Sequence, residues 1–226
     1  MAQFLYPFYT LAYIGLLVWA VFLWFRGSSL ALAIIFAIIV GLLYDNAVIG
    51  YGIYMGESDL LLNMNKLRFL IHGVLTPLLI LAALNQTKRF GVETAGKRWM
   101  QILFIVVALI LIGMGLAEFS NIQMEPVYYA GTLRYVDTNS TPPIPSIVTI
   151  VITAVLGIVV WRKAKWPWLF ATAVVMFVGS AIPPSVVGPT IGSGAEIVLI
   201  LGFIFTEKNL KDRNQIPELV TAPLGK

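Results

Sequence analysis

Long apolar runs separated by short polar or basic stretches dominate the hydrophobic pattern of this 226-residue chain. An α-helix needs about 20 predominantly apolar residues to cross a bilayer, and most of the runs approach that length. The seven runs cover residues 4–25, 30–55, 67–84, 99–119, 146–161, 168–182 and 191–205. The pattern predicts an all-α polytopic membrane protein, a single bundle of seven transmembrane helices over residues 1–226 with a short, polar, frayed tail at 207–226.

The connections between these runs are short, with one exception. Residues 57–65 form a short polar stretch. The longest connection, residues 121–145, carries two adjacent tyrosines, then Arg134 and Tyr135, and ends in a proline-rich exit. Its segment 128–136 fits either a short β-hairpin or a surface helix, and the pattern does not choose between them.

The composition supports lipid as the solvent of this chain. Hydrophobic residues make up 59% of the chain and charged residues only 12%, whereas a soluble domain has about 25% charged residues. The chain has no cysteine, which excludes disulfides, thiolate nucleophiles and cysteine metal sites. No basic region precedes the first apolar run and no clear cleavage site follows it, so we expect a retained helix rather than a signal peptide.

The basic residues predict the orientation of the bundle. If seven helices alternate, 12 of the 15 Lys and Arg residues lie on one side, and only Lys66, Arg68 and Arg134 lie on the other. Positive charge marks the cytoplasmic face. We therefore expect the N-terminus outside and the C-terminus in the cytoplasm, in a bacterial inner membrane or its equivalent. The tryptophans of the predicted aromatic belt on the basic side are Trp24, Trp99, Trp161, Trp166 and Trp168.

Five ionisable residues fall inside the apolar runs: Asp45, Arg68, His72, Glu118 and Glu196. A carboxylate at the centre of a bilayer costs about 2.5–3.5 kcal/mol on insertion scales, so such groups usually have a function. With the predicted orientation, all five lie in the outer half of the membrane. Their clustering predicts a candidate site there.

Helical spacing groups further polar residues with these five. Arg68 and His72 share one face of the third run with Thr76. Two tyrosines of the second run share a face next to that of Asp45, and glycines on its own side allow close approach of a helix or ligand. We predict Asp45 and Glu196 as catalytic residues. The predicted substrate-binding residues are Tyr44, Asn46, Tyr51, Arg68, His72 and Glu118.

Each of these residues also has a structural interpretation. Arg68 can form a structural bridge with Asp45 or with Glu118, and Glu118 lies near enough to the interface to be hydrated. His72 can be a hydrogen-bonded packing residue, and the tyrosines can belong to an interfacial belt. Asp45 and Glu196 lie well inside apolar helices, which favours a functional role for both.

Several chemistries are excluded before a reaction is considered. The last apolar run contains no lysine, which a retinal protein requires there. One histidine and no cysteine argue against haem ligation and against a multi-histidine metal site. The chain has no phosphate loop, dinucleotide fingerprint or nucleophile elbow. We expect no metal and no other cofactor.

The remaining chemistry is that of two buried carboxylic acids among aromatic residues. A neutral acid in a dry pocket can protonate an alkene or an epoxide, and aromatic faces stabilise the resulting carbocation. A second carboxylate can balance charge or accept the final proton. This is the chemistry of an intramembrane isoprenoid cyclase.

The chain resembles the small seven-helix integral-membrane terpene cyclases of meroterpenoid and indole-terpenoid pathways. The resemblance covers the length, the lack of a soluble domain and two carboxylates: Asp45 in Leu43-Tyr44-Asp45-Asn46 and Glu196 in Gly194-Ala195-Glu196-Ile197. The family usually has Glu on the second helix and Asp near the last, so this chain departs from it at both acids. The resemblance implies that Asp45 is the general acid and Glu196 its partner or the final base.

Three hypotheses about function make different structural predictions. A terpene cyclase needs a tapered apolar cavity that holds both carboxyls and opens to lipid. Its expected partners are the bilayer and an apolar isoprenoid or lipid-like molecule, and we expect no nucleic acid. A solute, ion or proton transporter, or a receptor-like binding protein, needs a water-filled funnel to the charged cluster. A structural or assembly subunit needs no sizeable cavity. The stretch 183–194, rich in proline and glycine, predicts a cavity-lining entry to the last helix.

Overall fold

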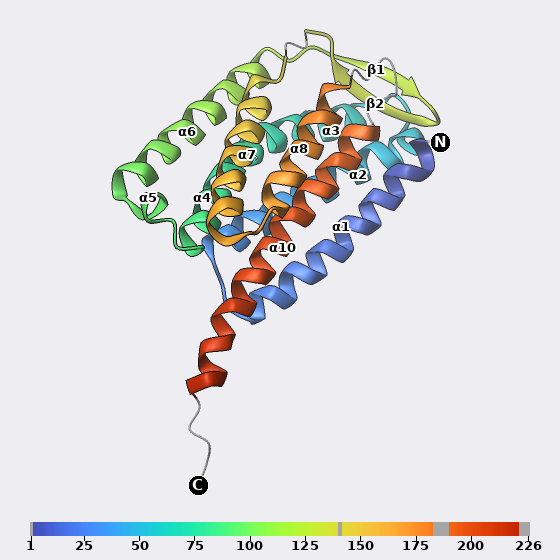
Figure 1. The fold of residues 1–226 in the computed structure, drawn as a ribbon. Coiled ribbons are helices and arrows are strands. Elements are labelled where there is room, and N and C mark those ends of the chain that lie inside the picture. The colour runs from blue at the N-terminus through green and yellow to red at the C-terminus, as the bar shows by residue number, and fades with distance from the viewer. Residues whose placement is uncertain (1, 140–141, 183–189, 222–226) are drawn as a thin grey trace.

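The computed structural model describes residues 2–139, 142–182 and 190–221, with side chains up to residue 213. It is a bundle of helices with one two-stranded hairpin (Figure 1). In chain order the elements are α1 (Ala2–Phe25), α2 (Leu30–Met55), α3 (Asp59–Leu75), the 3₁₀ turn η1 (Thr76–Leu78), α4 (Leu79–Arg89), α5 (Glu93–Gly96), α6 (Arg98–Ser120), β1 (Met124–Tyr129), β2 (Thr132–Asp137), α7 (Ile144–Ala164), α8 (Trp168–Ala181) and α10 (Thr190–Thr221). Most of the cavity-lining entry predicted at 183–194 lies outside the described residues.

Six helical segments within this description are long and apolar enough to cross a membrane. They are Ala2–Phe25, Leu30–Met55, Asp59–Arg89, Arg98–Ser120, Ile144–Ala164 and Thr190–Arg213. All seven predicted apolar runs are helical, but α8 has only 14 residues and is shorter than the other six. Their outer faces are apolar; on α1, for example, Phe8, Leu11 and Phe22 are each more than 60% exposed. An apolar surface of this extent is typical of a protein that contacts lipid.

The third segment is longer at both ends than the predicted range 67–84. The polar stretch 57–65 is mostly the first part of α3, because the Ser58 hydroxyl accepts a hydrogen bond from the N–H of Leu61 at 3.3 Å and caps the helix. At the other end, Pro77 cannot donate a backbone hydrogen bond, and the helix tightens into η1 before α4 continues to Arg89.

The predicted frayed tail is wrong for most of its length. Helix α10 continues from Thr190 to Thr221, past the end of the last apolar run. Glu207 and Lys211 in this extension are buried, because contacts with other elements replace water around them. A hydropathy pattern detects the end of the apolar run but not these tertiary contacts.

The segment 128–136 belongs to a β-hairpin, which decides between the two alternatives left open by the sequence. Strands β1 and β2 pair antiparallel, with Tyr129 opposite Thr132. The two turn residues, Ala130 and Gly131, have φ values of 46° and 86°. Positive φ at both positions is typical of the primed turns that suit the twist of a tight hairpin.

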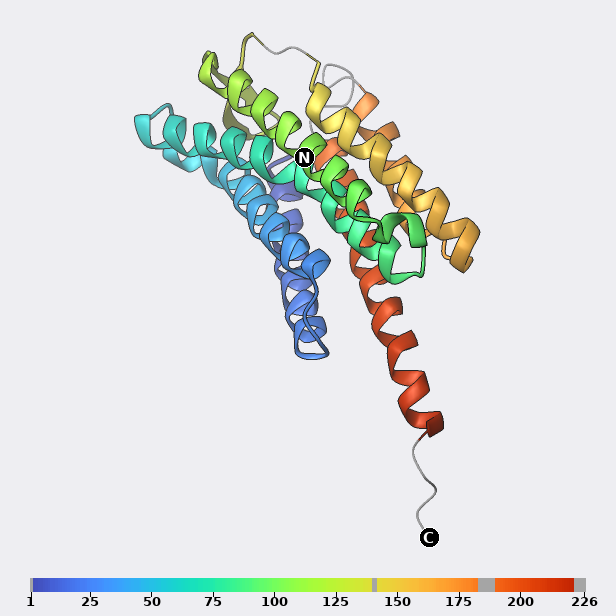
Figure 2. The same cartoon turned by 90° about the vertical axis from the view of Figure 1, so that its left-hand side faces the viewer.

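The two ends of the bundle differ in chemistry. One end carries the N-terminus, the α2–α3 connection and the β-hairpin (Figure 1), and we call it the hairpin end. The other carries the α1–α2 loop, the α4–α6 connection, the α7–α8 connection and the extension of α10, which protrudes beyond the bundle (Figures 1 and 2). Contacts such as Arg26–Asp212 and Arg213 with the carbonyl of Ala164 join these elements, and we call this the basic end.

The core fills the space between α1, α2, α4, α8 and α10. Its largest fully buried side chains include Ile35 and Ile39 of α2, Leu169 of α8 and Phe203 of α10. Helix α1 packs along α2, and α8 packs between α7 and α10 (Figure 2). This packing turns one face of α1, α2 and α10 towards a shared interior at the hairpin end.

Candidate functional site

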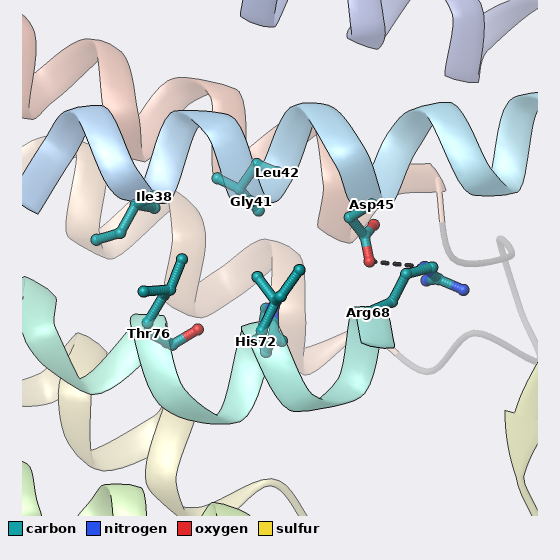
Figure 3. Close-up of a pocket in the computed structure, with 9 residues that line it drawn as sticks. Ile38, Gly41, Leu42, Asp45, Arg68, His72 and Thr76 are labelled. Atoms are coloured by element: carbon teal, nitrogen blue, oxygen red, sulfur yellow. Dashed lines mark hydrogen bonds and ion pairs between the residues drawn. The ribbon is translucent and has the colours of Figure 1, made fainter. Parts of the chain in front are cut away.

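Asp45 and Arg68 form an ion pair between α2 and α3. The Nε of Arg68 donates to Oδ1 of Asp45 at 2.8 Å, and its Nη1 donates to Oδ1 of Asn65 at 2.5 Å (Figure 3). The helices can approach closely here because Gly41 has no side chain; a Cβ atom there would lie 2.8 Å from Cγ2 of Ile71. Of the two partners considered for Arg68, the structure selects Asp45 rather than Glu118.

A small cavity lies beside this ion pair. Asp45, Arg68, His72 and Thr76 line it together with apolar side chains of α2 and α3 (Figure 3). The face predicted for Arg68, His72 and Thr76 is therefore confirmed. The cavity has a volume of about 20 Å³, which is room for roughly one water molecule. It does not reach Glu196, so it is not the tapered cavity for both carboxyls that a cyclase requires.

Glu196 lies on α10 and faces the same interior from the other side. Its carboxyl is within electrostatic range of Asp45 and Arg68. The neighbouring Ala195 packs against Gly179 of α8, where a Cβ would lie only 2.7 Å from that of Ala195. Glu196 is half-buried and makes no ion pair or hydrogen bond with the described part of the chain. The two predicted catalytic carboxyls thus face one interior, although no single described cavity contains both.

Three tyrosines of α1 form a wall of this interior that the sequence analysis did not identify. Tyr6 and Tyr13 are fully buried. The Tyr13 hydroxyl has no hydrogen-bond partner among the described residues, whereas the Tyr6 hydroxyl lies near Ser193. Tyr13 lies within electrostatic range of both Glu196 and Asp45. Tyr9, between them, donates to the carbonyl of Thr190 at 3.2 Å. The spacing 6, 9, 13 was a detectable signal, since it follows one face of a helix whose opposite face is apolar.

The β-hairpin closes the interior at its end. Leu133 of β2 is fully buried against α2 and α3. The N–H of Tyr135 donates to Oδ1 of Asn65 at 3.2 Å, the same oxygen that accepts from Arg68. Arg134, between Leu133 and Tyr135, faces Tyr6 and, at longer range, Arg68 and Asp45. Burial lowers the pKa of the Arg134 guanidinium, and the nearby Tyr6 acts in the opposite direction.

The remaining predicted substrate-binding residues contribute less or not at all. Glu118, near the end of α6, is exposed, and Tyr51 is 51% exposed on the outside of α2. The Tyr44 hydroxyl donates to the carbonyl of Met64 at 3.1 Å and so joins α2 to α3. Asn46 is fully buried and donates to the carbonyl of Leu42 in its own helix. The structure therefore does not bring Tyr51 and Glu118 to the site, because their helix faces point outwards.

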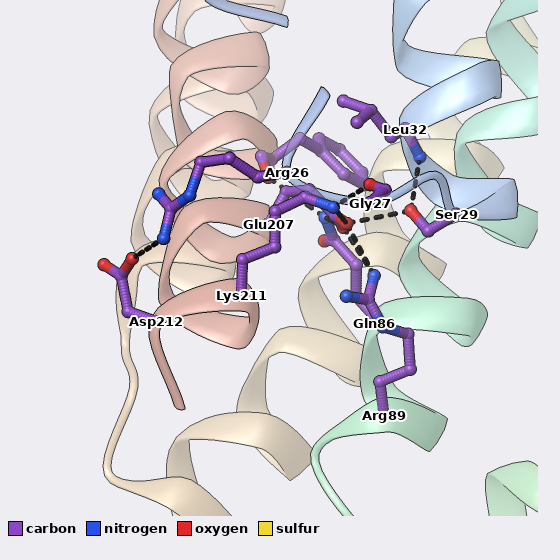
Figure 4. A network of polar contacts seen from close by, with 10 residues as sticks. Arg26, Gly27, Ser29, Leu32, Gln86, Arg89, Glu207, Lys211 and Asp212 are labelled. Carbon is purple, nitrogen blue, oxygen red and sulfur yellow. Dashed lines mark hydrogen bonds and ion pairs between the residues drawn. The ribbon is translucent and has the colours of Figure 1, made fainter. Parts of the chain in front are cut away.

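A different polar network lies at the basic end, around Glu207 of α10 (Figure 4). Nη1 of Arg89 lies 2.6 Å and 2.8 Å from the two carboxylate oxygens of Glu207. Ser29 Oγ donates to Oε1 at 2.8 Å, and Gln86 Nε2 donates to Oε2 at 3.3 Å. Lys211, whose Nζ lies 3.6 Å from Oε1, also donates to the carbonyl of Gly27. The network joins the α1–α2 loop, α4 and α10.

Neither candidate metal-binding residues nor similarity to known proteins gives a further indication of function. Within the part of the chain that the structure describes, no group of three or more His, Cys, Asp or Glu residues could hold a metal ion. No known protein-family model matches this sequence, and no curated protein sequence is significantly similar to it.

Proposed function

We propose that this protein is an integral-membrane acid–base enzyme that acts on an apolar isoprenoid or lipid substrate, and that the reaction is a protonation-initiated terpene cyclisation. The observation that supports this proposal is the placement of Asp45 and Glu196. They come from helices far apart in the sequence, and their carboxyls act on each other across an interior walled by the aromatic rings of α1. An acid, a base and aromatic faces are the groups that such a reaction needs.

The ion pair favours a division of roles between the two acids that reverses the one implied by the family resemblance. Asp45 forms an ion pair with Arg68 at 2.8 Å, so its oxygen accepts from a cationic donor. Glu196 has no cationic partner of this kind within the described residues. We assign proton donation to Glu196 and proton acceptance to Asp45.

The reaction then balances without a further reactant. Glu196 gives its proton to an alkene or epoxide, the carbocation closes onto a second double bond, and Asp45 removes a proton from the cyclised cation. We assign the return of that proton to Glu196 to the hydroxyl of Tyr13, which lies within electrostatic range of both acids. The product is an isomer of the substrate, and the rings of Tyr6 and Tyr13 stabilise the cation on the way.

The proposal includes a topology. Helix α8 is counted as a short seventh crossing, which places the N-terminus outside and the basic end in the cytoplasm of a bacterial inner membrane or its equivalent. The site then opens towards the outer leaflet. Because the cavity beside Asp45 holds about one water molecule, an isoprenoid enters only if α10 separates from α1 or α2.

A structural subunit would also have no sizeable cavity, so cavity size does not distinguish it from an enzyme. The pairing of the buried polar groups does. A core that serves only packing satisfies nearly all of its buried polar groups. Here the Tyr13 hydroxyl lacks a partner among the described residues, and Glu196 forms no ion pair with any of them. These groups favour a site that receives a ligand.

The test compares three carboxylate variants in membranes that contain the full chain. Asp45→Asn and Glu196→Gln are incubated with farnesol, geranylgeraniol and their terminal epoxides, and products are identified by gas chromatography with mass spectrometry. We expect each variant to lose at least about 10²-fold of the cyclised product. Glu118→Gln, which changes an exposed carboxylate on α6, is the matched control and should leave the product unchanged.

The same experiment can contradict the proposal. Wild-type membranes that form no cyclised product from any of these substrates, or Asp45→Asn and Glu196→Gln variants with an unchanged product profile, would remove the support for a cyclase. Solute uptake by proteoliposomes that depends on Asp45 and Glu196 would favour the transporter instead.

A further inference from the structure

Arg134 is a cation that forms no ion pair within the described part of the chain. Its Nε atom is buried and has no hydrogen-bond partner, and its guanidinium forms no ion pair with any described residue. Arg134 is half-buried, and a partly desolvated guanidinium without an anion is unfavourable because it has lost part of its water without gaining a partner. Arginine also presents a rigid fork of donors that matches a carboxylate or phosphate.

The position of Arg134 is built into the fold. The preceding residue, Leu133, is fully buried, and its backbone carbonyl touches Gly52 so closely that a Cβ there would collide with it. The following residue, Tyr135, bonds to Asn65. The hairpin turn also contacts α1, because the N–H of Gln3 donates to the carbonyl of Ala130 at 3.4 Å. These contacts with α1, α2 and α3 fix the backbone on either side of Arg134 at the hairpin end.

The charges around Arg134 leave an anion missing. The titratable groups that act on it are, in order of strength, Tyr6, Arg68, Asp45 and Tyr129. Asp45, the only carboxylate among them, already bonds to Arg68, and Arg68 also uses Asn65. Two guanidiniums thus share one carboxylate, and the excess positive charge lies where the interior meets the hairpin.

We infer that Arg134 binds the anionic head of an amphipathic ligand, a carboxylate or a phosphate monoester at the end of an apolar chain, whose tail enters the interior towards Glu196. The inference names the substrate class of the proposed enzyme and rests on that proposal for the fate of the tail. Binding of the head depends only on Arg134 and its surroundings. A neutral isoprenoid alcohol would leave the guanidinium unpaired, so the head group gives the site its selectivity.

The test measures ligand binding rather than turnover. Purified full-length protein in lipid nanodiscs is titrated with farnesyl monophosphate, farnesoic acid, farnesol and inorganic phosphate, and binding is followed by calorimetry. For wild type we expect both farnesyl anions to bind at least about 10-fold more tightly than farnesol. Inorganic phosphate should bind far more weakly than farnesyl monophosphate; equal affinity would show a site for a free anion and would overturn the amphipathic ligand.

Variants of Arg134 localise the effect. Arg134→Gln should lower the affinity for farnesyl monophosphate about 10- to 100-fold and change the affinity for farnesol less than about 3-fold. Arg134→Lys should recover part of the lost affinity. Arg162→Gln, an exposed basic residue at the other end of the bundle, is the matched control and should change neither. An unchanged affinity of Arg134→Gln for the farnesyl anions contradicts the inference. If Arg134→Gln does not fold, the affinities of wild type and Arg134→Lys for the farnesyl anions and for farnesol still test the inference.

The outcomes separate this inference from the cyclase proposal. Tight, Arg134-dependent binding without any cyclised product contradicts the reaction but keeps the anion site. The opposite result is also possible: Glu196 is required for cyclisation, but Arg134→Gln binds and converts the substrate normally. That result supports the cyclase proposal and contradicts the anion site at Arg134.

Discussion

The two polar clusters of this bundle are built from similar residues but are completed differently. At the basic end, both oxygens of the buried Glu207 carboxylate have partners, supplied by Arg89, Ser29 and Gln86. At the hairpin end, the Tyr13 hydroxyl and the Nε atom of Arg134 lie within electrostatic range of Asp45 and have no partner among the described residues. Gln86 Oε1 at the basic end also has no partner among the described residues, so the contrast concerns the group at the centre of each cluster. A buried carboxylate whose two oxygens are both paired stabilises a fold, whereas unpaired buried groups cost stability and can be completed by a ligand. The comparison predicts opposite responses to substitution at the two ends.

The largest expected effect is at the basic end. Replacing Glu207 by alanine leaves Arg89 and Lys211 without their shared anion, and breaking a buried pair in this way costs about 3–5 kcal/mol. We expect a large decrease in the melting temperature of the detergent-solubilised protein, measured by intrinsic fluorescence. Glu118→Ala, in an exposed position, should leave it unchanged. A Glu207→Ala protein as stable as wild type would contradict the structural role of this network.

Substitutions in the Asp45–Arg68 pair should lower stability less than Glu207→Ala does, and the two residues should show an interaction energy. Asp45→Asn alone leaves the buried Arg68 uncompensated and should destabilise by about 2–3 kcal/mol. The double variant Asp45→Leu/Arg68→Met replaces both charges with apolar groups and should be more stable than the sum of the single changes predicts. Chemical denaturation of wild type, Asp45→Leu, Arg68→Met and the double variant gives the coupling energy. Strict additivity would mean that the two residues do not interact in the folded protein.

The docking of the hairpin can be broken without changing any charge. Gly52→Ala places a methyl group against the carbonyl of Leu133, and such overpacking typically costs about 1–3 kcal/mol. We expect faster proteolysis within residues 124–137 and weaker binding of farnesyl monophosphate. Gly113→Ala, where a Cβ meets nothing within 4 Å, is the matched control. Unchanged proteolysis of Gly52→Ala would contradict the close contact between α2 and the hairpin.

The smallest effect gives the sharpest contrast between the ends. Tyr13→Phe removes a buried hydroxyl that has no partner among the described residues, so stability should change by less than about 0.5 kcal/mol or increase. Ser29→Ala removes both a hydrogen bond to Glu207 and the cap of α2, and should cost about 1 kcal/mol. Thermal unfolding of both variants measures the difference. Equal losses at the two positions would contradict the distinction drawn between the clusters.

Local patterns predicted much of this fold. The apolar runs gave every long helix, since a helix in lipid must be apolar along most of its length. The i, i+4 spacing of Arg68 and His72 correctly placed them on one face with Thr76. The exposed tryptophans at the basic end also follow the pattern; Trp24, Trp99, Trp161 and Trp168 are exposed there.

What the sequence missed depends on contacts between distant segments. Glu207 reads as part of a polar tail until Arg89 and Ser29 are brought beside it. Tyr6 reads as one more aromatic residue in an apolar helix, and Arg134 as a charge on an exposed loop. Hydropathy and periodicity describe one segment at a time, so they cannot show that three segments complete one site.

The shortness of α8 has a consequence for the lipid around it. At 1.5 Å per residue its 14 residues span about 21 Å, whereas the hydrocarbon core of a bilayer is about 30 Å thick. If α8 crosses as proposed, lipid beside it must thin locally, because stretching an apolar helix is not possible. Gly179 of α8 packs directly against Ala195, the neighbour of Glu196. The thinnest part of the surrounding membrane would then lie next to the proposed proton donor, where the polar head of a lipid-borne molecule can approach the bundle most closely.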